Sequence, residues 1–80
     1  MTEQLAGLIA ERNDARIAFI KARFHRDAAS IYYDSVVTGS STLTHPAWDS
    51  FSAKQSEMDI AGDHLYLACT AIIDLVLAAV

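Results

Sequence analysis

The sequence has one cysteine, one proline and three glycines among its 80 residues. The lone Cys69 can form neither an internal disulfide nor a cysteine-based zinc site. An unpaired thiol within an apolar segment is typical of a reducing compartment, so we predict a cytoplasmic protein. Because few residues interrupt regular backbone structure, the composition favours long continuous elements.

Motifs that carry chemistry are also missing. None of the three histidines (His25, His45 and His64) follows a Glu or Asp by three residues, so the Glu-x-x-His pattern of di-iron bundles is lacking. There is no His-Glu-x-x-His helix, glycine-rich phosphate loop or Gly-x-Ser-x-Gly turn. We therefore predict a non-enzymatic protein without metal or cofactor. The alternative is a metal site shared between chains by His25, His64 and Asp63.

Positive charge is scarce. Six Lys and Arg residues stand against ten Asp and Glu residues, which gives a net charge of −4 and an isoelectric point near 5.0. This sign opposes a phosphate backbone, so binding to duplex nucleic acid is not expected. The first residues, MTEQLAGLIAER, have neither a basic segment nor a long apolar run, so no signal peptide is expected.

The most apolar segment is Leu65–Val80, LYLACTAIIDLVLAAV, in which Asp74 is the only charged residue. It is apolar nearly all round a helix, and such a helix is buried on several sides or lies in lipid. The run is shorter than the roughly 20 residues of a membrane span, and no Lys or Arg follows it, so we do not expect a membrane location. One short chain offers little to bury this segment, which predicts association with partner chains.

Turn-forming residues gather at one place, Thr38–Thr42, and Pro46 follows shortly after. Gly39 suits the position just past a helix end, and Thr44 suits an N-cap before a proline in the first turn. We predict a single domain, 1–80, with a helix over about 3–38, a turn over 39–44 and a helix over about 45–80. The short connection makes this an all-α antiparallel helical hairpin.

Apolar residues in the second predicted helix step by alternating three and four positions, which is a heptad seam. The seam contains Trp48, Phe51, Gln55, Met58, Gly62, Leu65, Cys69, Ile72, Val76 and Ala79. Gly62 within it indicates a close approach of another helix. The first predicted helix has two apolar sides: Ala6, Ala10, Ile17, Ile20, Phe24, Ala28 and Ile31 on one, and Ala15, Ala18, Ala22, Ala29, Tyr33 and Val36 on the other.

A lone hairpin can use only one apolar side of each helix, so we expect two or more hairpins to form a four-helix bundle or a higher oligomer. The residues expected in the oligomer core are Leu65, Cys69, Ile72 and Val76. The alternative is a compact three-helix monomer with an extra break near Ser52–Ser56.

Five of the six basic residues lie in the first half of the chain, and the second half has a net charge of −4. One interpretation is pairing between the helices, with Lys21 and Arg23 level with Asp59–Asp63 and Arg12 level with Ile72–Asp74. The other is a site for a small anionic ligand or nucleotide on the first helix. Its candidate residues are Arg12, Arg16, Phe19, Arg23 and Arg26.

A second candidate surface lies just after the turn, where aromatic rings adjoin carboxylates. Trp48 and Phe51 supply apolar area, and Asp49 and Glu57 supply negative charge, a combination that suits a basic protein partner. The simpler interpretation, which we favour, is that the two rings only close the bundle end. Taken together, the sequence predicts a non-enzymatic oligomeric helical protein that acts by protein–protein interaction. An inhibitor or regulator of a host or defence protein, as phages and mobile elements carry, is one form of it.

Overall fold

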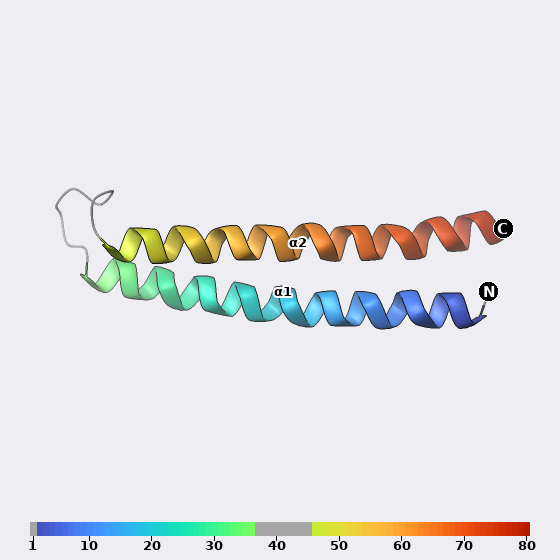
Figure 1. The fold of residues 1–80 in the computed structure, drawn as a ribbon, viewed down its shortest axis with the longest axis horizontal. Coiled ribbons are helices and arrows are strands. Elements are labelled where there is room, and N and C mark those ends of the chain that lie inside the picture. Colours follow the sequence, from blue (N-terminus) through green and yellow to red (C-terminus); the bar gives the residue numbers. More distant parts are fainter. Residues whose placement is uncertain (1, 37–45) are drawn as a thin grey trace.

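A computed structural model describes residues 2–36 and 46–80, and the protein is a hairpin of two long α-helices (Figure 1). Helix α1 is Thr2–Val36 and helix α2 is Pro46–Ala79. The molecule measures 58 × 16 × 13 Å. The predicted all-α antiparallel hairpin is confirmed. The predicted turn at 39–44, with Gly39 and Thr44, and His45 lie outside the described residues.

The residues in the first turn of each helix suit a helix N-terminus. Residues 2–36 contain no proline, and Glu3 places a negative charge in the first turn of α1, where it complements the helix dipole. Helix α2 opens with Pro46 in the first turn, where a missing N–H costs nothing, and Asp49 adds the same favourable charge. Helix α2 runs without a break through Ser52–Ser56, so the three-helix alternative is wrong.

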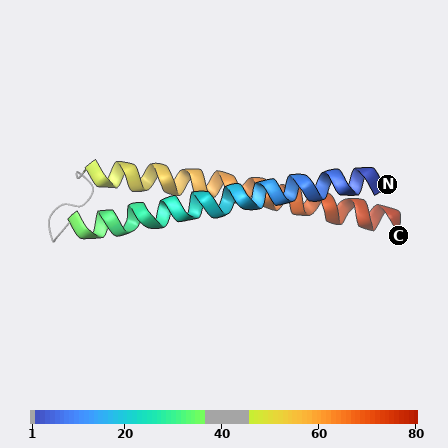
Figure 2. The same cartoon turned by 90° about the horizontal axis from the view of Figure 1, so that it is seen from below.

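The two helices run side by side along their length and cross at a shallow angle, as the two views show together (Figures 1 and 2). Three contacts fix their register: Phe19 packs on Gly62, Arg26 bonds to Gln55, and Tyr33 meets Trp48. In each pair the two residue numbers add up to 81. A constant sum over four turns of helix means that the antiparallel register is kept without slippage.

The side of α1 that faces α2 carries half-buried residues at alternating steps of three and four. They are Leu5, Leu8, Arg12, Ala15, Phe19, Ala22, Arg26, Ala29 and Tyr33. On α2 the half-buried residues include the predicted seam from Trp48 through Ile72, whereas Val76 and Ala79 are exposed. The heptad pattern thus identifies the contact side of α2, and the alanine-rich side of α1 is the one that meets it.

Full burial is rare in this hairpin. Among the described residues only Ala47 is buried, with 4% of its surface exposed. Two helices in contact cover one stripe on each other and leave the rest of each cylinder open. Residues 2–36 and 46–80 therefore form a seam without an enclosed core.

Candidate interaction surfaces

Three aromatic rings join the helices at the end of the hairpin where Val36 and Pro46 lie, which we call the turn end. The Tyr33 ring centre lies 5.7 Å from that of Trp48 and 6.1 Å from that of Phe51, and the Trp48 and Phe51 centres are 5.9 Å apart. These separations are typical of favourable aromatic pairs. Trp48 and Phe51 are half-buried in this cluster, so much of their area is already used within the chain.

The acidic members of the predicted partner surface lie apart from these rings. Asp49 is exposed, and Glu57 forms an ion pair of 3.5 Å with Lys54 one turn earlier in the same helix. The four residues therefore do not converge on one hollow. This arrangement supports the simpler interpretation, in which the rings close the turn end.

A polar chain crosses the seam one turn further along. Arg26 Nη1 donates to Gln55 Oε1 at 3.2 Å, and Gln55 Nε2 donates to Asp59 Oδ1 at 3.0 Å. Arg26 Nε also lies 2.9 Å from Asp27 Oδ1. Gln55, the polar member of the predicted seam, thus links an arginine of α1 to a carboxylate of α2. Such a bond fixes which residues stand opposite each other.

The five residues of the predicted anion site do not share one surface. Arg12, Phe19 and Arg26 are half-buried on the side facing α2, and Phe19 covers Gly62. Arg16 and Arg23 are exposed. Seven residues separate these two, which is about 10 Å along a helix, too far for both to grip one phosphate without large side-chain movement. A helical projection of α1 places these arginines on one stripe. Packing against α2 separates them, because it half-buries Arg12 and Arg26 and leaves Arg16 and Arg23 exposed.

Arg12 is the least satisfied of these side chains. Its Nη2 donates to Asn13 Oδ1 at 3.2 Å, while its Nε is buried and has no hydrogen-bond partner in the described part of the chain. By the register, Arg12 is level with Cys69, one turn away from the predicted Ile72–Asp74. No acidic side chain of α2 therefore stands opposite it at hydrogen-bonding distance.

The predicted ion pairs between the helices also do not form among the described residues. Both ion pairs there, Arg26–Asp27 and Lys54–Glu57, lie within single helices. Lys21 and Arg23 do come level with Asp59–Asp63, but both basic residues are exposed and point away from the seam. The opposite charges of the two helices consequently remain available on the surface.

The residues predicted for the oligomer core differ in how far they are buried. Leu65, Cys69 and Ile72 are half-buried against α1, and Val76 keeps 45% of its surface exposed. Their further burial by partner chains stays a prediction.

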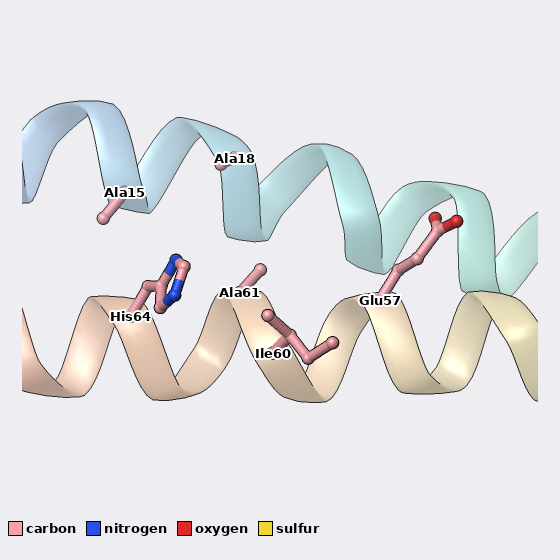
Figure 3. Close-up of a pocket in the computed structure, with 6 residues that line it drawn as sticks. All are labelled: Ala15, Ala18, Glu57, Ile60, Ala61 and His64. Atoms are coloured by element: carbon pink, nitrogen blue, oxygen red, sulfur yellow. The ribbon is translucent and has the colours of Figure 1, made fainter.

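An apolar groove runs between the helices on one side of the hairpin (Figure 3). It holds about 250 Å³, and its lining is Ala15, Ala18, Glu57, Ile60, Ala61 and His64. A neighbouring hollow shares Ala15 and His64 and adds Glu11, Leu67, Ala68 and Ala71. The sequence interpretation missed this groove, although alanines at helical spacing on both helices are the signal that could have located it.

Large apolar side chains remain exposed on both helices, away from the seam. On α1 four of them, Ile17, Ile20, Phe24 and Ile31, lie on one side of the helix, with Phe24 70% and Ile31 71% exposed, and we call these four the α1 outer face. On α2, Ile60 and Leu67 are also exposed, and we call them the α2 outer face. On a helical projection each outer face lies opposite its own seam. Tyr66, Ile73 and Leu77 are exposed as well, toward the end of α2.

Helix α2 is the one described helix that is long and apolar enough, by length and composition, to cross a membrane, which by itself is weak evidence. The fold adds an argument against that location. By the register, Glu11, Arg12 and Asp14 of α1 lie alongside the apolar half of α2. A bilayer around α2 would therefore have to accept these charges or strip α1 away.

Groups that bind metals are dispersed in the described part of the chain, where no three His, Cys, Asp or Glu side chains gather closely enough to hold an ion. His64 lines the groove, and the His25 ring stacks edge-on against Phe24 with centres 6.2 Å apart. The chain was also compared with protein families, curated proteins and solved structures, and none of the three comparisons gives a match.

Proposed function

We propose that this protein is a non-enzymatic, self-associating helical scaffold that acts by binding other protein chains. The observation that carries the proposal is a contrast within the described part of the chain, where one residue is buried and many large apolar side chains are exposed on both helices. A soluble monomer rarely leaves contiguous apolar surface of this extent uncovered. If partner chains covered the outer faces, the half-buried seam residues between α1 and α2 would become part of a buried core.

The kind of partner follows from the surface. Apolar stripes along straight helices fit other helices, which pack ridges into grooves at 8–10 Å between axes. An inhibitor or regulator of a host or defence protein is one form of such a scaffold, and a cytoplasmic location suits its unpaired Cys69.

Light scattering coupled to size exclusion tests the proposal at micromolar concentration, where we expect at least a dimer. The melting temperature should rise with protein concentration, because self-association stabilises only the folded state. A stable helical monomer with a concentration-independent melting temperature would contradict the proposal. Flotation with anionic vesicles serves as the membrane control: the protein should stay in the soluble fraction.

Binding of a small anion is the alternative function. A hollow beside Arg23, lined also by Phe19, Ile20, Phe24 and Asp27, is the observation in its favour. Asp27 brings a negative charge to the same hollow, and Arg12 and Arg26 are half-buried in the seam. A thermal-shift screen with nucleotides separates the two functions. Stabilisation by several degrees that is lost in Arg23→Ala would favour the ligand function.

A further inference from the structure

The two outer faces differ in the charge that surrounds them. Residues 15–26, which contain most of the α1 outer face, include four Lys and Arg residues and no Asp or Glu, and of these four only Arg26 is paired in the described part of the chain, with Asp27. Residues 55–80, which contain the α2 outer face, include four Asp and Glu residues and no Lys or Arg, and of these four Glu57 is paired with Lys54. Arg16, Lys21 and Arg23 make no ion pair among the described residues, so this charge is open to a partner.

This difference selects one kind of contact between copies. Packing α1 on a second α1 would bring two basic segments together, and packing α2 on a second α2 would bring two acidic segments together. Like charges across an interface disfavour association, and opposite charges steer it. Packing α1 of one copy on α2 of the next joins basic to acidic and apolar to apolar.

The position of the faces supports the same contact. Each outer face lies opposite its seam, so an α1 that docks on the α2 outer face extends the hairpin as a row of alternating α1 and α2 helices. The α2 outer face borders the apolar groove, since Ile60 lines it together with Glu57 (Figure 3). Leu67 lines the neighbouring hollow together with Glu11. The exposed Phe24 and Ile17 of the docking α1 would pack on Ile60 and Leu67, beside this groove.

We infer that the α1 outer face of one copy docks on the α2 outer face of a second copy, in a head-to-tail contact between different surfaces. A contact of this type leaves one unused face at each end of a pair, so it continues until it closes into a ring or grows into a filament. The inference rests on the proposed self-association and specifies which surfaces carry it.

Complementary blocking variants provide the test. Ile17→Asp with Phe24→Asp blocks only the α1 outer face, and Ile60→Asp with Leu67→Asp blocks only the α2 outer face. Each double variant alone should be monomeric, because it lacks one half of the contact. An equimolar mixture should form a dimer with one chain of each kind, since one intact face of each type remains. Native mass spectrometry identifies that dimer by mass.

Matched controls use exposed rings outside both faces. Tyr32→Asp on α1 and Tyr66→Asp on α2 each introduce one carboxylate, at side chains of similar exposure to the substituted ones. Single variants of the two faces, Phe24→Asp and Leu67→Asp, match them in charge. Both control variants should keep the parent assembly. If a blocked variant loses helix on its own, circular dichroism of the mixture gives a second readout, and helix should return when the two variants combine.

The possible outcomes separate this inference from the proposed function. A parent protein that is monomeric overturns both. A parent oligomer together with self-association of either blocked variant overturns the head-to-tail contact and leaves self-association standing. A mixture that forms no mixed dimer and regains no helix also overturns the head-to-tail contact.

Discussion

At the turn end of the hairpin, Tyr33, Trp48 and Phe51 meet across the seam, and the Arg26–Gln55–Asp59 chain follows one turn later. At the opposite end, where the two termini lie together (Figure 1), the residues are more apolar and yet no better covered. Ile73 and Leu77 keep 56% and 68% of their surface exposed. Apolar side chains are exposed at both ends, since Ile31 near the turn end is 71% exposed. The aromatic pairs and the hydrogen bond between the helices in the described part of the chain, in contrast, all lie toward the turn end.

This difference has a physical origin in side-chain size and position. Large rings from both helices fill the space between them at the turn end, and polar groups bond across it. Toward the termini, α1 offers Leu5, Leu8 and Arg12, and α2 is apolar on several sides. One neighbouring helix can cover only one of those sides. The following substitutions test the comparison, beginning with the largest expected effect.

The substitution Ile72→Asp tests the seam at the terminal end. Ile72 is half-buried against α1, and a carboxylate there would lose apolar contact and part of its hydration. The nearest cation in the seam is Arg12, one turn away. We expect the free energy of unfolding to fall by about 3 kcal/mol, enough to remove most of the folded population. Urea denaturation followed by circular dichroism measures the change.

Ile73→Asp is the matched control, because it places the same charge on the neighbouring, exposed side chain. It should change the stability of the hairpin far less. Equal losses for Ile72→Asp and Ile73→Asp would mean that the seam is wrongly assigned at this end.

The substitution Trp48→Ala tests the turn end. It removes one ring from the cluster with Tyr33 and Phe51, and Trp48 is only half-buried, so we expect a loss of about 2 kcal/mol. Trp48→Phe should recover most of that loss, because it keeps an aromatic partner for Tyr33. A variant with alanine that melts with the parent would show that the cluster contributes little to stability.

Much of the fold follows from particular residues in the sequence. Pro46 and the turn residues before it predict two helices, and the three-and-four spacing from Trp48 to Ile72 predicts the contact side of α2. The contact side of α1 is harder to predict, because that helix has two apolar sides of similar strength. Only packing against α2 decides that Ala15, Ala22 and Ala29 face inward and that Ile17, Phe24 and Ile31 face outward.

The geometry of the candidate anion site could not be predicted from α1 alone either, because it too depends on packing against α2. Arg12, Phe19 and Arg26 are spaced by seven residues, so a helix that packs along α1 can take all three into one seam. A helical projection of α1 alone groups them with Arg16 and Arg23, because it contains no second helix. The groove beside His64 likewise depends on both helices, and neither helix shows it alone.

The substitution Arg12→Leu tests what the buried guanidinium of Arg12 costs the stability of the seam. The buried Nε of Arg12 has no hydrogen-bond partner in the described part of the chain, and an unmade hydrogen bond of this kind costs stability. Leucine at a heptad position next to Leu5 and Leu8 should therefore raise the free energy of unfolding by about 1 kcal/mol. Thermal denaturation measures it. Gln55→Leu serves as the contrast: it removes the hydrogen bonds to Arg26 and Asp59 and should destabilise the hairpin.

The substitution Gly62→Ala tests how closely the helices approach near the middle of the seam. A Cβ at Gly62 would lie 3.4 Å from the nearest Phe19 ring carbon, which is ordinary van der Waals contact. Alanine also restricts the unfolded chain, so we expect a gain of roughly 0.5–1 kcal/mol. Gly7→Ala is the control for the backbone contribution alone, because nothing lies within 4 Å of its Cβ position. Gly62→Leu, in contrast, would displace the Phe19 ring and should destabilise. If Gly62→Ala destabilises while Gly7→Ala stabilises, the Phe19 ring lies too close to Gly62 to accept a Cβ, and the 3.4 Å separation is wrong.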